Sequence, residues 1–173
     1  MSILSQGKRT RRICLDAIMV AAAMMLSYLE VLLPLNLMIP LPGFRLGLAN
    51  IVITLAFCLI SPFDAAIVSA LRILLMGLLF GSATSLYFSA LGGIFAFLAL
   101  LLCKFLLTKC SFLGISALCA AAHNCGQIVA ASTLFGGAVV FSYLPWLLLA
   151  SGIYGGIVGV LLNLLMPRME RFL

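Results

Sequence analysis

Long apolar runs separated by short polar breaks make up most of this chain. The runs cover residues 13–33, 46–60, 65–80, 85–107, 112–135 and 141–166. Proline, glycine and charged residues mark the breaks between them. Because about 20 apolar residues in an α-helix cross the hydrocarbon core of a bilayer, the pattern predicts an all-α integral membrane protein, a bundle of about six transmembrane helices. The second and third runs are short, which leaves tilted or partly re-entrant helices open there.

Basic residues set the expected topology of this bundle. Only 8% of the 173 residues are charged, against 65% hydrophobic, and the net charge is +6. We expect residues 1–12 to form a basic cytoplasmic arm and residues 13–173 a single polytopic membrane domain. Lys104, Lys109, Arg168 and Arg171 fall on the same side as the arm if six helices alternate, and the connections on the opposite side contain only Arg45. The positive-inside rule then predicts a protein of the cell membrane with both termini in the cytoplasm. The net charge is explained by topology, so no nucleic-acid partner is expected.

Several ionisable or strongly hydrogen-bonding side chains fall within or beside the apolar runs. Such groups are expensive in a membrane and are functional candidates by default. The alternation of helices brings them all to the outer half of the bundle, where they predict a substrate-binding pocket that opens outward. They are Glu30, Arg45, Asn50, Arg72, Tyr87, His123, Asn124 and Gln127.

Each of the two arginines in this set has two interpretations. Arg45 follows a Pro-Gly turn, and its guanidinium suits an anionic ligand, but an arginine at a helix end also extends routinely to lipid headgroups. Arg72 stands inside an apolar helix and needs an acidic group, carbonyls, water or a bound anion. It could bind a ligand, or it could pair with Glu30 to fix helix register. Asp64 is a further possible partner.

His123 and Gln127 lie one helical turn apart and therefore share a face, with Asn124 slightly around the helix. These side chains need partners inside a membrane. A ligand site and an interhelical hydrogen-bond network would satisfy them equally well.

Metal-dependent and nucleophilic chemistry find no support in the sequence. There is one histidine, and the six cysteines form no CxxC pair, so a zinc site is disfavoured and the cysteines are expected to pack as small apolar residues. The four acidic residues are scattered, whereas magnesium–diphosphate chemistry needs clustered carboxylates. No Walker motif is present, so ATP hydrolysis would require other subunits. We expect no cofactor and no catalytic residues.

Pairs of small residues spaced by four positions favour close helix packing in lipid. Ala17 and Ala21 form such a pair on the first helix. Glycines form the others, which are Gly43/Gly47, Gly77/Gly81, Gly152/Gly156 and Gly155/Gly159. Gly47 also allows another backbone or a ligand to approach closely.

Four motifs in order along the chain resemble a known family. They are PGFRLGLANIV at 42–52, YFSALGG at 87–93, AAHNCGQ at 121–127 and SYLPWLLLASGIYGG at 142–156, with the Arg72 helix between the first two. Together they resemble the small bacterial membrane proteins called heptaprenyl diphosphate synthase component I, or the Gx transporter family, over nearly all of the chain after Ile13. Cys119 stands where the family pattern has a glycine.

This resemblance implies two functions. One is a substrate-binding subunit similar to the S components of energy-coupling-factor (ECF) transporters, which binds a small anionic or amphipathic solute and relies on a coupling subunit and ATPases. In that case Ala17 and Ala21 match the small-residue pair that contacts the coupling subunit. The alternative is a non-catalytic membrane partner of a heptaprenyl diphosphate synthase in menaquinone side-chain synthesis. We favour the first.

Overall fold

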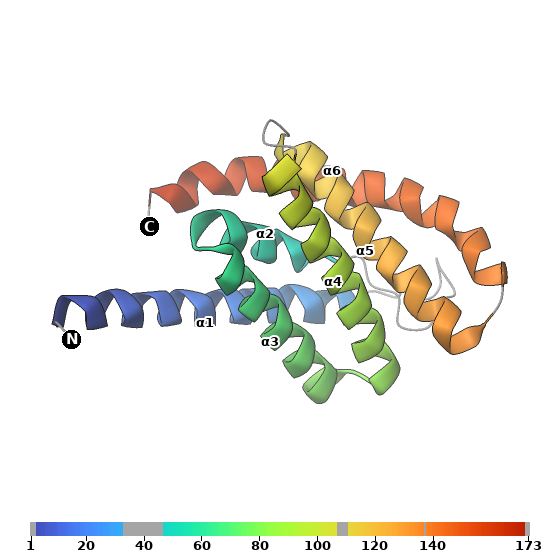
Figure 1. Ribbon diagram of the computed structural model, residues 1–173, viewed down its shortest axis with the longest axis horizontal. Coiled ribbons are helices and arrows are strands. Elements are labelled where there is room, and N and C mark those ends of the chain that lie inside the picture. Colours follow the sequence, from blue (N-terminus) through green and yellow to red (C-terminus); the bar gives the residue numbers. More distant parts are fainter. Residues whose placement is uncertain (1–2, 33–46, 107–110, 137, 172–173) are drawn as a thin grey trace.

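Six α-helices make up the described part of the protein in a computed structural model (Figure 1). The structure describes residues 3–32, 47–106, 111–136 and 138–171. The helices are α1 (Ile3–Leu32), α2 (Asn50–Leu59), α3 (Pro62–Phe80), α4 (Ala83–Leu106), α5 (Phe112–Phe135) and α6 (Leu144–Glu170), with a 3₁₀ segment, η2 (Ala138–Tyr143), before α6. Five of these helices are long and apolar enough to cross a membrane. The all-helical membrane fold is therefore confirmed.

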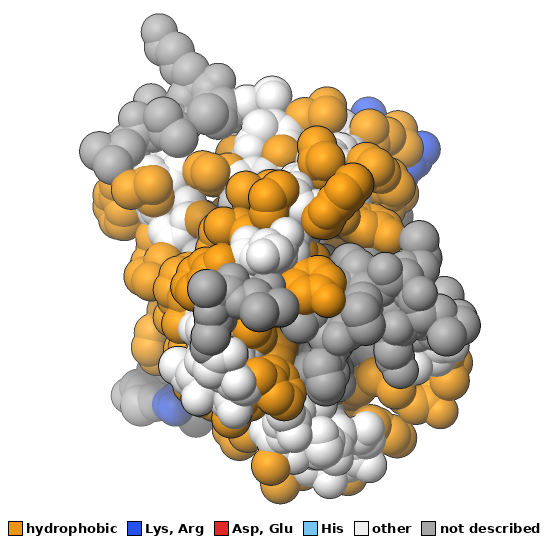
Figure 2. Space-filling view, turned by 90° about the vertical axis from the view of Figure 1, so that its right-hand side faces the viewer, with side chains coloured by type: hydrophobic (Ala, Val, Ile, Leu, Met, Phe, Trp, Pro, Cys, Tyr) orange, Lys and Arg blue, Asp and Glu red, His pale blue; other side chains and the backbone are white. Residues whose placement is uncertain are grey.

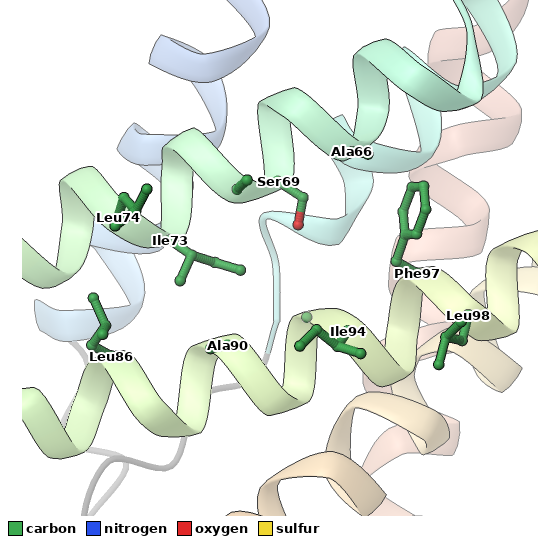
Figure 3. Close-up of a pocket in the computed structure, with 11 residues that line it drawn as sticks. Ala66, Ser69, Ile73, Leu74, Leu86, Ala90, Ile94, Phe97 and Leu98 are labelled. Carbon is green, nitrogen blue, oxygen red and sulfur yellow. The ribbon is translucent and has the colours of Figure 1, made fainter.

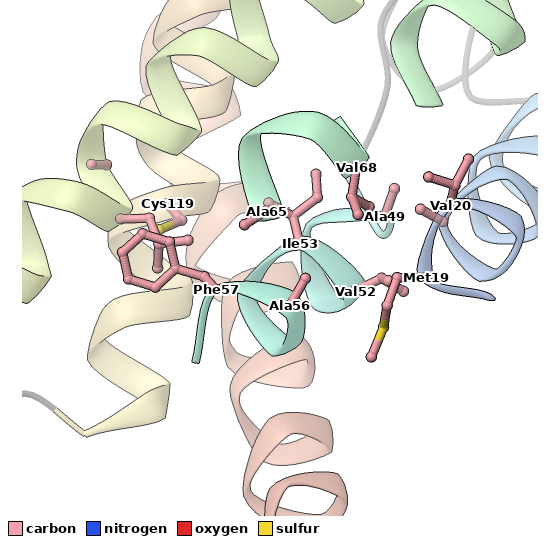
Figure 4. Packing of buried hydrophobic residues seen from close by; sticks show 13 residues of the cluster. Met19, Val20, Ala49, Val52, Ile53, Ala56, Phe57, Ala65, Val68 and Cys119 are labelled. Carbon is pink, nitrogen blue, oxygen red and sulfur yellow. The ribbon is translucent and has the colours of Figure 1, made fainter. Parts of the chain in front are cut away.

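The second helix is much shorter than the others. At 1.5 Å per residue the ten residues of α2 extend over about 15 Å, half of a hydrocarbon core. Its residues from Asn50 to Phe57 are all buried. In Figure 4, side chains of α2 such as Val52, Ile53 and Phe57 pack at the centre of the apolar core. A short helix at membrane depth is tolerated when protein surrounds it, and α2 meets that condition.

The helices form two groups, which we call the N-terminal half (α1–α3) and the C-terminal half (α4–α6). Within each half, neighbouring helices pack on one another, and the halves meet where α2 contacts α6 and where α3 contacts α4. The ends of α1 and α6 that carry the chain termini lie toward the same side of the molecule (Figure 1). Residues 3–12 of the predicted basic arm continue directly into the membrane helix as part of α1.

Glycines bring the backbones of the C-terminal half into close contact. A Cβ atom added to Gly126 of α5 would lie 2.5 Å from the carbonyl oxygen of Leu91 on α4. Added to Gly155 or Gly159 of α6, it would lie 2.6 Å from a Cα atom of α5. The predicted Gly155/Gly159 pair is thus a packing site. By contrast, a Cβ atom on Gly152 or Gly156 would meet nothing within 4 Å, so that pair lies on an open face.

An ion pair joins the two long helices of the N-terminal half. Arg12 of α1 binds Asp64 of α3 through both its Nε and its Nη2, at 2.7–3.0 Å. Ser61 caps α3 by accepting the amide N–H of Asp64, and its hydroxyl donates to the same carboxylate at 2.7 Å. Arg12 thus provides a partner for Asp64 at the start of α3, eight residues and about 12 Å along the helix from Arg72; pairing of Asp64 with Arg72 stays a prediction.

The surface of the bundle is apolar, as a lipid-facing surface must be. Figure 2 shows hydrophobic side chains over much of the described surface of one face, with the visible lysine and arginine atoms at its margins. Large exposed hydrophobic residues include Leu78 at 77%, Phe105 at 72% and Trp146 at 71%. In water such a surface would aggregate, so the bilayer is its natural solvent.

Candidate functional site

The candidate site is built around the turn that precedes α2, where residues from several helices meet. Gly47 has φ of 83°, a left-handed conformation that favours glycine. The amide of Asn50 donates to the carbonyl of Gly47 at 2.9 Å, which starts the helix immediately after this turn. Gly47 is buried, and the side chains of Glu30 on α1 and His123 on α5 both contact this turn.

His123 of α5 lies between this turn and α4. A Cβ atom on Gly47 would be 3.3 Å from its Cδ2, and a Cβ atom on Gly92 would be 2.7 Å from its Cε1. The imidazole is 1% exposed. Its ring thus fills the space that side chains at two glycines would otherwise take. Gly47 does allow a close approach, but the group that approaches is the side chain of His123, whereas the sequence predicted another backbone or a ligand.

Gln127 and Asn124 extend the polar cluster around His123. Nε2 of Gln127 lies 2.9 Å from Nε2 of His123, which confirms that these two residues share a face. Asn124 points elsewhere: its Nδ2 donates to the carbonyl of Leu147 on α6 at 2.8 Å. Both side chains are buried. Asn124 therefore joins α5 to α6, while His123 and Gln127 face the seam between the two halves.

Glu30 of α1 reaches the same turn from the N-terminal half. Its Oε1 accepts a hydrogen bond from the amide of Leu48, the residue after Gly47. Because N–H groups at a helix N-terminus favour negative charge, the carboxylate of Glu30 suits the start of α2. Glu30 is 3% exposed and Asn50 is 8% exposed. The predicted Glu30, Asn50, His123 and Gln127 are thus brought together around residues 47–50.

Arg72 lies on the face of α3 that packs against α1. Its Nη1 donates to Oγ of Ser27 at 3.3 Å, and the residue is 1% exposed. Ser27 and Glu30 are three residues apart and so occupy neighbouring positions on one face of α1. This arrangement puts the guanidinium on the face of α1 that also carries the Glu30 carboxylate. Pairing of Arg72 with Glu30 stays a prediction, as does binding of a solute.

Two predicted residues lie apart from this cluster or beyond the described segments. Tyr87 is at the start of α4, where its hydroxyl lies 3.1 Å from Oγ1 of Thr133. Thr133 follows His123 by ten residues, so Tyr87 is about 15 Å further along the bundle. Arg45 lies outside the described residues.

The sequence interpretation missed two serines. Ser27 was indistinguishable from a small packing residue, and its contact with Arg72 depends on how α1 and α3 cross. Ser89 of α4 is 4% exposed, and its Oγ has no hydrogen-bond partner among the described residues. Ser89 lies three residues before Gly92, which contacts His123, and therefore on a neighbouring position of the same helix face. A hydroxyl at helical spacing from a glycine motif was the available signal.

The chemistry of this site suits binding better than bond making or breaking. No group of three or more His, Cys, Asp or Glu side chains that could hold a metal ion occurs in the segments that the structure describes. The donors and acceptors instead combine one guanidinium, one carboxylate, one imidazole, two amides and hydroxyls in an apolar setting. Hydrogen bonds and charge contacts strengthen when water is excluded, so such a cluster can select a polar or anionic group.

Comparison with known proteins gives one match. A sequence model of the family described as "Heptaprenyl diphosphate synthase component I" matches residues 19–165, which include every polar residue of the cluster. Neither the curated proteins nor the solved structures contain a significant match to this chain.

Proposed function

This chain belongs to the heptaprenyl diphosphate synthase component I family, and we propose that it is a substrate-binding subunit of a membrane transporter. In this proposal it binds a small anionic or amphipathic solute from the outer side, through Arg45, Arg72, Asn50 and the His123 cluster. Partner ATPase subunits, which this chain cannot replace, would drive release.

The observation that carries this proposal is the polar cluster around the turn at residues 47–49. Side chains from α1, α2 and α5 meet there. The ring of His123 lies so close to two glycines, Gly47 and Gly92, that larger residues at those positions would collide with it. A bundle that needed only stability could use apolar side chains at these positions, because buried polar groups rarely stabilise more than a well-packed core. Burying polar and charged side chains inside a membrane costs free energy, and proteins typically accept that cost along a substrate pathway.

The outer surface of α1 supports the predicted contact with a coupling subunit. Ala17 and Ala21 are both exposed, and the neighbouring Ile18 and Met25 are 63% and 69% exposed. Small residues at i and i+4 let another helix approach closely in lipid. This face is therefore available to a partner helix.

A second candidate function follows from the family's description. The chain would then be a non-catalytic membrane component that acts with a prenyl diphosphate synthase. The lack of clustered carboxylates supports a non-catalytic role, since a metal-bound diphosphate would need them.

The decisive experiment is purification of the protein from its native membrane, with mass spectrometry of all co-purifying proteins and small molecules. Coupling and ATPase subunits together with a bound anionic solute would support transport. A stoichiometric prenyl diphosphate synthase, with neither ATPase nor solute, would overturn the transport proposal in favour of the second candidate.

Arg72→Ala tests the site itself. We expect it to weaken binding of the co-purifying solute at least tenfold, because a buried guanidinium contact is lost. Arg168→Ala is the matched control, since it also removes one arginine but at an exposed position near the end of α6. Unchanged solute binding by folded Arg72→Ala would show that Arg72 serves to fix α1 against α3 through Ser27.

A further inference from the structure

A wide groove and a small void share a wall at the seam between the two halves. The groove, of about 420 Å³, lies between α3 and α4 and is apolar except for Ser69 (Figure 3). It opens toward the bilayer, because Ile94 and Leu98 on its walls are exposed. Gly93 and Phe97 of α4 line this groove and also the void, which lies among α2, α4 and α5. Lipid chains suffice to fill the groove, whereas the void lies behind it, inside the protein.

The small void has polar side chains on two of its sides. Asn50 and Thr54 are one turn apart on α2 and so share a face, and they line the void together with Cys119 of α5. Asn50 is 8% exposed, and Thr54 and Cys119 are each 4% exposed. Within the segments that the structure describes, the side chains of Asn50 and Thr54 form no hydrogen bond. Burial of an amide or a hydroxyl without a partner costs free energy, and most buried polar groups in proteins have one. We therefore expect a partner in the void.

The size of the void fits one water molecule. The centre of a water-sized sphere can lie within about 10 Å³ of it, close to the roughly 10–15 Å³ that a buried water needs. A phosphate, a carboxylate or a larger group would not fit. A water molecule there has three polar neighbours, which are the amide of Asn50, the hydroxyl of Thr54 and the weakly polar thiol of Cys119. Because buried waters make about three hydrogen bonds, size and chemistry agree.

We infer that this void binds a single structural water molecule, hydrogen-bonded to Asn50 and Thr54 and in contact with Cys119. The water is a polar link across the seam, because Asn50 and Thr54 belong to the N-terminal half and Cys119 to the C-terminal half. The inference goes beyond the proposed function and does not depend on it, since the water is bound with or without a solute.

Magic-angle-spinning NMR of the full chain in lipid bilayers tests whether water occupies the void. We expect a cross-peak between water and the side chain of Thr54, whereas the methyl groups of Val68, which is 0% exposed, should show none at the same mixing time. Ala96→Val, which adds two methyl groups to a wall of the void, should abolish the Thr54 cross-peak while that of exposed Thr10 persists. If Ala96→Val does not fold, Cys119→Leu fills the void from α5. Lack of a water cross-peak to Thr54 in the wild-type protein would overturn the inference.

The unfolding equilibrium of Thr54→Val tests whether the water is hydrogen-bonded to the hydroxyl. Valine keeps the shape of threonine but cannot bond to water, so we expect the equilibrium constant for unfolding in mixed micelles to rise about fivefold. In a dry void the hydroxyl would have no partner, and valine would leave the constant unchanged or lower it.

Ser116→Ala is the matched control for Thr54→Val. The hydroxyl of Ser116 is also buried without a partner among the described residues, but it lies outside the walls of the void. Its loss should therefore not raise the unfolding constant. If Thr54→Val is as stable as the wild type, or if Ser116→Ala destabilises the protein equally, the hydrogen-bonded water is wrong.

Discussion

The two halves of this protein are held together by different forces. In the C-terminal half, glycines let helix backbones touch, so that α4, α5 and α6 pack through many short-range contacts. In the N-terminal half, polar and charged side chains make the specific links: Arg12 with Asp64, Ser27 with Arg72, and Glu30 with the amide of Leu48. Close backbone packing tolerates little displacement, whereas directional bonds can be exchanged for others. The specificity of packing in the C-terminal half therefore depends on backbone contact, whereas the N-terminal half adds these polar links to the apolar core around α2.

The strongest test of this contrast is Gly126→Ala. A Cβ atom there would lie 2.5 Å from a backbone oxygen that cannot turn aside, so we expect a loss of about 1–3 kcal/mol in the free energy of unfolding. Gly152→Ala is the control, since its Cβ atom meets nothing within 4 Å, and its helix propensity should stabilise the protein by up to about 1 kcal/mol. Reversible unfolding in mixed micelles measures both. Equal stability of the two variants would contradict close packing as the basis of the C-terminal half.

A comparison of two helix caps gives a smaller effect. Ser61 caps α3 and also contacts the Arg12–Asp64 pair, whereas Ser111 caps α5 by accepting only the amide of Gly114 at 3.3 Å. We expect Ser61→Ala to lower the free energy of unfolding by about 1–2 kcal/mol and Ser111→Ala by about 0.5–1 kcal/mol. The same unfolding assay ranks them. If Ser111→Ala costs as much as Ser61→Ala, the polar network adds nothing to the N-terminal half.

The smallest expected effect belongs to Tyr87→Phe. It removes the hydroxyl that lies 3.1 Å from Thr133 Oγ1 at an exposed end of α4 and α5, so the free energy of unfolding should fall by only ~0.5 kcal/mol. Because Tyr87 lies far from His123 along the bundle, solute affinity should change less than twofold. A tenfold loss of affinity, measured beside Arg72→Ala, would return Tyr87 to the binding site.

Periodicity and length made the helices predictable, but the links between helices were less so. The pairing of His123 with Gln127 follows from a spacing of four on one helix, and residue 47 as a close-contact point follows from its lack of a side chain. By contrast, Arg12 and Asp64 are 52 positions apart, and only the tilt of α1 against α3 brings them together. For Ser89 the sequence offered only its helical spacing from Gly92, which is a weak signal because a serine in an apolar run packs as readily as it binds.

The brevity of α2 has a consequence for how the protein is made. Segments enter the membrane during synthesis when they are apolar and long enough to span it, and ten residues fall well short. We therefore expect α2 to be left outside the bilayer until α1 and α3 provide a surface for it. Membrane topology would then be completed only when the helices fold together. A substitution that weakens the contact of Glu30 with Leu48 would therefore reduce the yield of correctly inserted protein, whatever its effect on ligand binding.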